Sequence, residues 1–139
     1  MNPVQRRMVL EREAENILLA RGYQVVIVTD LFRNKQYIPY NLIAVKQYDD
    51  GSADRLAVRL RVTLHEITSL QDAKVVCSDD VRWLRKASAR DPEASVDFRF
   101  EVWIPARPDS FRQFEITRDG IRETRPDEYR SAFRAGGAE

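Results

Sequence analysis

The chain has 139 residues, of which 43% are hydrophobic and 32% are charged, and its formal net charge at pH 7 is +1. This length fits one domain with one core, and the balanced charge gives no overall attraction to nucleic acid or membranes. The single cysteine and single histidine exclude an internal disulfide and a Cys/His zinc site built within the chain. Because no apolar run is long enough for a secretion signal or a membrane span, we expect a cytoplasmic protein without membrane contact.

The first half of the chain predicts a helix followed by three strands. Residues 3–21 place apolar side chains at helical spacing, with Asn2 as the expected N-cap and Gly22 as the stop. The β-branched run 23–28 predicts a strand that is covered on both faces. Residues 40–62 predict a β-hairpin, because two apolar β-rich runs flank an Asp-Gly turn.

The second half begins with a stretch whose apolar residues follow neither the spacing of a helix nor that of a strand. Within residues 64–77, Ser69 and Asp72 indicate a turn or a short helix, whereas the last four residues favour an extended segment. A second helix is predicted over residues 78–90, because Ser78 is a good N-cap and the acids after it suit the positive end of a helix.

Two further strands and a charged extension complete the chain. Residues 96–105 alternate between apolar and polar side chains, which predicts one buried face and one wet face that carries Arg99 and Glu101. Another strand is expected over residues 111–117. We assign residues 119–139 to a charged C-terminal extension with a short helix, around 127–133, and a flexible end.

The order of these elements predicts an α/β fold for residues 1–118. The order is helix, three strands, helix and two strands, or αβββαββ. A central mixed sheet with a helix against each face satisfies it, because the strand at 23–28 needs cover on both sides.

Two short motifs add a resemblance to a known superfamily. The first is Glu-Arg-Glu at 11–13 ahead of Arg-Gly-Tyr at 21–23, and the second is Asn-Leu-Ile-Ala-Val at 41–45, followed by a polar-apolar-basic triplet on the next strand. With the element order, they resemble the PD-(D/E)XK nuclease superfamily, and within it the restriction-endonuclease-like and archaeal Holliday-junction-resolvase-like domains. The resemblance covers residues 11–117.

The resemblance implies an active site at four positions, and three of them depart from the superfamily pattern. The pattern has acids on the second and third strands that hold Mg²⁺, a lysine two residues on, and often a glutamate on the first helix. Glu11 matches this glutamate, but Asn41, Arg59 and Arg61 stand where the two acids and the lysine belong. Because guanidinium groups repel a dication, we expect no metal or other cofactor at this vestigial site. A donor-rich cleft that suits a phosphate or carboxylate remains.

Each of these residues also has a structural interpretation. Arg59 and Arg61 either face solvent on an edge strand or pair with Glu11. Asn41 caps the turn after Pro39. Glu11 is otherwise an ordinary charge on the surface of a helix.

Other chemically interesting side chains are expected to be structural. His65, beside Glu66, has no positioned partner in the sequence, so we place it in a loop. Cys77 is interpreted as a small buried residue rather than a reactive thiol. Trp83 and Trp103 are interpreted as packing aromatics.

The leading functional hypothesis is a catalytically degenerate nuclease-fold domain. It would bind DNA, RNA or a partner protein without metal-dependent cleavage. Basic residues on the third strand and the second helix would then contact the anionic ligand, namely Arg59, Arg61, Arg82 and Lys86.

Two alternatives come from other functional classes. One is an active Mg²⁺-dependent endonuclease whose catalytic acids have migrated, with four candidates: Glu11, Glu13, Asp30 and Glu66. The other is an interaction or assembly subunit that uses the strand at 111–117 as a pairing edge, as a homodimer or with another protein. Only the first alternative makes the protein an enzyme, with Mg²⁺ as its cofactor.

Overall fold

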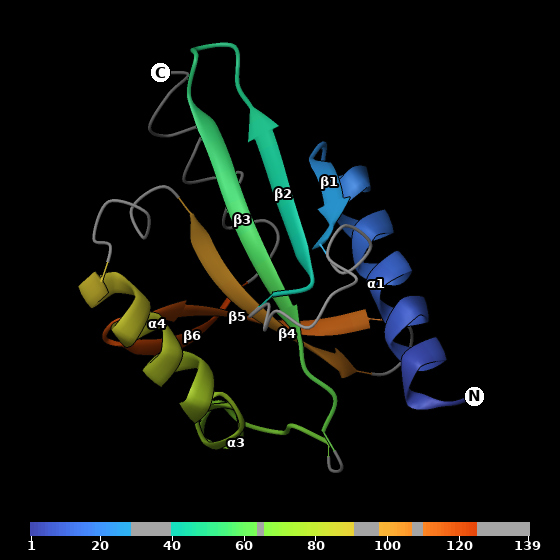
Figure 1. Ribbon diagram of the computed structural model, residues 1–139, viewed down its shortest axis with the longest axis vertical. Coiled ribbons are helices and arrows are strands. Elements are labelled where there is room, and N and C mark those ends of the chain that lie inside the picture. Colours follow the sequence, from blue (N-terminus) through green and yellow to red (C-terminus); the bar gives the residue numbers. More distant parts are fainter. Residues whose placement is uncertain (29–39, 64–65, 91–97, 107–109, 125–139) are drawn as a thin grey trace.

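The computed structural model describes residues 1–28, 40–63, 66–90, 98–106 and 110–124, which form a six-stranded mixed sheet with helices on both faces (Figure 1). The elements are α1 (Pro3–Ala20), β1 (Gln24–Ile27), β2 (Leu42–Gln47), β3 (Ala53–Leu60), α3 (Leu70–Val76), α4 (Ser78–Arg90), β4 (Arg99–Ala106), β5 (Ser110–Thr117) and β6 (Gly120–Thr124). The strands lie in chain order across the sheet, and neighbours are antiparallel except for the parallel pair β3 and β4. The predicted α/β class with a mixed sheet is confirmed.

Helix α1 begins and ends as the sequence predicts. The Asn2 side chain accepts from the Gln5 backbone N–H at 2.8 Å, and the Gln5 side chain accepts from the Asn2 N–H at 3.0 Å, which completes a capping box. The chain leaves the helix through Gly22, whose φ of +92° favours glycine. The predicted N-cap and stop are therefore both correct.

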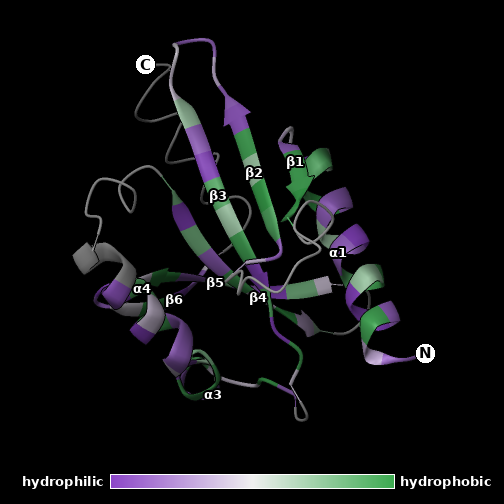
Figure 2. Cartoon of the chain, viewed as in Figure 1, coloured by the Kyte–Doolittle hydropathy of each residue, from purple (hydrophilic) through white to green (hydrophobic). Residues whose placement is uncertain are grey.

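Two hydrophobic clusters, one on each face of the sheet, hold the layers together. In the first, Ala14 and Leu18 of α1 pack against Val58 and its neighbours in β2 and β3. In the second, residues of α3 and α4 such as Leu84 pack against Val102 and other side chains of β4 and β5. Figure 2 shows hydrophobic residues along most of β2, which packs against α1. No described helix is both long and apolar enough to cross a membrane.

Strand β1 lies at an edge of the sheet, and the prediction that it is covered on both faces is wrong. Tyr23 and Ile27 pack in the first cluster, whereas Val26 between them is 45% exposed. The β-branched run supplies one buried face, because alternate side chains of a strand point to opposite sides.

Strand β4, by contrast, is buried on both faces. Val102 packs in the second cluster and Trp103 in the first. Glu101 is only 2% exposed, so the predicted wet face of this strand is wrong. Its charged residues meet partners inside the protein, as described below.

The sheet continues further towards the C-terminus than predicted. Residues 120–124, assigned to an extension from the sequence, form β6 and pair with β5. Strand β5 therefore has a partner on each side and cannot serve as the predicted pairing edge. The short helix and flexible end that were predicted after it lie outside the described residues.

The stretch before α4 forms the short helix α3. Ser69 is its N-cap and accepts from the Asp72 N–H at 3.1 Å. The predicted short helix is confirmed, and the extended alternative for residues 74–77 is wrong. The loop predicted before β2 and the loop residue His65 lie outside the described residues.

Candidate functional site

Two arginines at the end of β3 converge on one carboxylate of α4. Arg59 Nε lies 3.3 Å from Asp80 Oδ1, and Arg61 donates to both Asp80 oxygens, at 3.0 Å from Nε and 3.2 Å from Nη2. The side chain of Asp80 is 6% exposed, whereas those of Arg59 and Arg61 are 29% and 24% exposed. One buried carboxylate thus holds two cationic groups that still reach the surface.

Local structure explains why these three side chains meet. Arg59 is in register with Val102, whose side chain belongs to the cluster beneath α4, so Arg59 points towards that helix. Arg61 follows two residues later and shares this direction. Asp80 lies in the first turn of α4, where the helix dipole favours a carboxylate.

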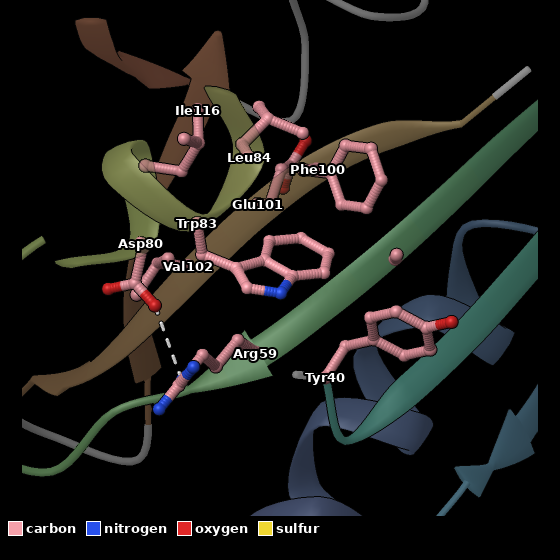
Figure 3. Close-up of a pocket in the computed structure, with 10 residues that line it drawn as sticks. Tyr40, Arg59, Asp80, Trp83, Leu84, Phe100, Glu101, Val102 and Ile116 are labelled. Atoms are coloured by element: carbon pink, nitrogen blue, oxygen red, sulfur yellow. Dashed lines mark ion pairs between the residues drawn. The ribbon is translucent and has the colours of Figure 1, made fainter. Parts of the chain in front are cut away.

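A small pocket adjoins the arginine pair. Tyr40, Trp83 and Phe100 line it together with Arg59 and Asp80, as Figure 3 shows. Its volume of about 20 Å³ is enough for water but not for an organic cofactor. The Trp83 ring meets the Phe100 ring edge-on, with centroids 5.8 Å apart, which confirms a packing role for this tryptophan.

Basic side chains continue from this pocket along one flank of α4. Arg82 and Lys86 are both exposed and lie one helical turn apart. Lys86 is also one turn from Trp83, which lines the pocket. Arg82 lies 3.4 Å from Asp79, a pair that is exposed on both sides and therefore contributes little to stability.

Glu11 and Asn41 form a separate cluster on the α1 side of the sheet. Asn41 Nδ2 donates to Glu11 Oε2 at 3.1 Å, and Asn41 Oδ1 accepts from the Leu60 N–H at 2.9 Å. Arg7 Nε lies 3.7 Å from Glu11 Oε1. Glu11 is 2% exposed, so it is a buried link between α1 and β3 rather than a surface charge.

The single cleft expected for Glu11, Asn41, Arg59 and Arg61 is therefore divided between two faces of the sheet. Leu60, between the two arginines, packs towards α1, so the arginines point towards α4. Their acidic partner is Asp80 and not Glu11, and β3 is an interior strand rather than an edge. Asn41 joins Glu11 to Leu60 instead of capping a turn.

Sequence reasoning missed a network of buried polar groups on the α1 face of β4. The Tyr23 hydroxyl donates to Asp54, which also accepts from Arg99 Nη2 at 3.1 Å. Arg99 Nε lies 3.6 Å from Glu101 Oε2, and Trp103 Nε1 donates to Glu101 Oε1 at 2.8 Å. Burial raises the pKa of Glu101 to about 7, although the Arg99 charge acts in the opposite direction. Because Asp54 and Glu101 are 5% and 2% exposed, we assign this network a structural role.

The described residues give no support to a metal site. Among them, no group of three or more His, Cys, Asp or Glu side chains is placed to hold a metal ion. Of the candidate acids, Glu11 is hydrogen-bonded to Asn41, Glu13 is partly buried on the same helix, and Glu66 is exposed elsewhere. Asp30 lies outside the described residues.

Cys77 is fully buried, as the sequence predicts. Burial raises the pKa of its thiol to about 12, and the negative charge of Asp80 adds to this effect. The thiol therefore stays protonated at neutral pH and is a poor nucleophile.

Comparisons of the chain with models of protein families, with curated proteins and with solved structures find no match. The structure shows an α/β fold with three helices among the described residues and a six-stranded mixed sheet. The resemblance to the PD-(D/E)XK superfamily stays a prediction from the sequence.

Proposed function

We propose that this protein is a degenerate nuclease-fold domain of the restriction-endonuclease-like type that binds the phosphate backbone of a nucleic acid without cutting it. The single observation that carries the proposal is the pair Arg59 and Arg61, held side by side on Asp80 at a partly exposed surface. Guanidinium groups suit phosphate because their planar donors match two of its oxygens.

The charge of the neighbouring helix supports an extended anionic ligand. Arg82 and Lys86 are exposed along the same flank of α4, while the acids of this helix, Asp79 and Asp80, lie in its first turn. A chain of phosphates that follows this flank would meet Arg82 and Lys86 beyond the acids of the first turn. Contacts of this kind depend on salt and carry no base-sequence information.

The proposal excludes cutting because the carboxylates needed for metal-dependent hydrolysis are replaced. Mg²⁺ sites in nucleases need acidic ligands, but the α4 face carries the cations Arg59 and Arg61, and Asn41 lies on the other face with Glu11. Asp80, the carboxylate beside the arginines, is engaged by both of them. This favours the binding hypothesis over the hypothesis of migrated catalytic acids.

The binding test is a titration of labelled single-stranded and duplex DNA and RNA, followed by fluorescence anisotropy across a salt series. The variant Arg82→Gln/Lys86→Gln changes two exposed side chains and should leave the fold intact. We expect weaker binding and a salt slope that is smaller by about one for each lost phosphate contact. Arg12→Gln/Arg55→Gln, which removes the same charge from other exposed positions, is the matched control.

Three results would contradict this proposal. One is the lack of salt-dependent binding to any of the four nucleic acids, and another is an equal loss of affinity in the test and control variants. The third is cleavage of the same substrates with Mg²⁺ or Mn²⁺ that EDTA abolishes, which would restore the hypothesis of an active nuclease.

A further inference from the structure

A cavity of about 350 Å³ lies between the first turns of α1 and the end of β3, far larger than the pocket beside Arg59. Figure 1 shows the N-terminal end of α1 and the segment after β3 at the same end of the molecule. The cavity is within the size range of small-molecule sites. Leu10, Leu60 and Val62 give it an apolar wall.

The rim of this cavity is cationic. Arg6 and Arg7 both line it, from the first turns of α1. Within the described part of the chain Arg6 takes part in no ion pair, and the Arg7 side chain stays 48% exposed beside Glu11. The first turn of α1, residues 3–6, has no acidic residue, so the positive end of the helix dipole reinforces the two guanidinium groups.

Two side chains of the cavity wall, Leu10 and Leu60, are held in place by the rest of the fold. The Leu60 backbone N–H is held by Asn41, and Asn41 is held in turn by Glu11. Leu10 is 8% exposed and belongs to the core under α1. A preformed apolar wall lowers the ordering cost of binding.

We propose that this cavity binds an amphiphilic anion, that is, a hydrocarbon chain that carries a carboxylate or phosphate head. The chain would lie against Leu10, Leu60 and Val62, and the head would be held by Arg6 and Arg7. The charge of the rim and the apolar character of the wall are complementary to this ligand class and to neither a sugar nor a cation. The site is separate from the nucleic-acid surface on α4 and does not depend on it.

The test titrates the full chain with hexanoate, octanoate, decanoate and decyl phosphate, all below their micelle concentrations, by calorimetry and NMR. We expect saturable binding that tightens about fourfold for each methylene buried, until the cavity is full. Both head groups should bind, and their relative affinity identifies the preferred one. Decanol, which lacks the charge, should bind more weakly.

Val62→Glu places a negative charge in the wall and should weaken decanoate binding about tenfold or more. Val62 is 48% exposed, so this change should not unfold the protein. Val75→Glu on α3, where the valine is 68% exposed, is the matched control and should bind as the wild type does. Arg82→Gln/Lys86→Gln should also keep full amphiphile binding, which separates this site from the proposed nucleic-acid surface.

Failure of all four amphiphiles to bind saturably would overturn the proposal, as would equal affinities of the Val62 and Val75 variants for decanoate. Binding to vesicles that contain phosphatidylglycerol, without binding of the monomeric amphiphiles, would also overturn it. That result would assign the basic end of α1 to a membrane surface instead.

Discussion

Replacing Glu101 by glutamine should abolish a pH-dependent loss of stability. The carboxyl is 2% exposed and lies against Trp103 Nε1 and Arg99, and its pKa is raised from 4.5 to about 7. Glutamine has nearly the same shape and keeps an oxygen that accepts from Trp103. The variant therefore removes the ionisation while it preserves the packing.

The sign and size of the effect follow from the two pKa values. The folded state holds a proton that the unfolded state releases above pH 4.5, so the stabilising contribution of this proton is complete below pH 4.5. It is lost as the pH rises to about 7, and the difference between the two pKa values corresponds to about 3 kcal/mol. Relative to the wild type, Glu101→Gln should thus gain about 3 kcal/mol between pH 4.5 and pH 7.5, or roughly 10 °C in melting temperature.

The assay is urea unfolding of both proteins at several pH values across this window. Taking the difference between them cancels the titration of groups that do not contact Glu101. Glu66→Gln, at an exposed position, is the control and should not reproduce the gain. A difference that stays flat with pH, or that falls as the pH rises, would refute the claim that burial dominates at this carboxyl.

Three further predictions concern the two cores and the arginine pair. Leu18→Ala, at a fully buried position, should lower the free energy of unfolding by about 3 kcal/mol. Leu19→Ala, at a position that is 51% exposed, should lower it by less than about 0.5 kcal/mol. Similar losses in the two variants would contradict the packing of α1. Iodoacetamide at pH 8 should label Cys77 slowly in the native protein and fast in urea, since its thiol pKa is about 12, and rapid native labelling would show that the site opens. Asp80→Asn should lower the free energy of unfolding by about 1 to 2 kcal/mol, a modest loss because the two arginine partners are partly exposed to water. The same variant should bind nucleic acid more tightly, since it removes a negative charge beside the arginines. If neither stability nor affinity changes, the assigned role of Asp80 is wrong.

The elements that the sequence predicted well are those with local signals. Helix α1 begins at the Asn2 cap and ends before Gly22. The cap hydrogen bonds and the positive φ of Gly22 depend only on residues that are near in the sequence. The hairpin of β2 and β3 turns at Gly51, whose φ is +89°. Signals of this kind act within a few residues, so they can be read from one chain.

The errors arise where a partner lies far away in the sequence. Arg99 and Glu101 alternate with apolar residues, which is the pattern of a strand with one solvent-facing side. In the structure this side packs under α1, and Arg99 bonds there to Asp54, 45 residues away. Asp80 fits the pattern of an acid in the first turn of a helix. No signal in the neighbouring sequence predicts its ion pair with Arg61, which lies 19 residues earlier. The prediction that the four site residues share one cleft failed for the same reason, because sequence spacing alone does not tell which helix covers which face of the sheet.

The parallel pairing of β3 and β4 has a consequence for how the protein folds. The other neighbouring strands in the described sheet are antiparallel, and β2 with β3, like β5 with β6, is joined by a short turn that closes quickly. The ends of β3 and β4 are separated by the whole of α3 and α4, so their pairing must wait for a long crossover to close. The bond between Asp54 and Arg99 forms only at this step, and a slip of one residue would turn Arg99 to the opposite face. This pair therefore sets the register of the last strands to join, and Arg99→Met should slow refolding more than it speeds unfolding in stopped-flow measurements.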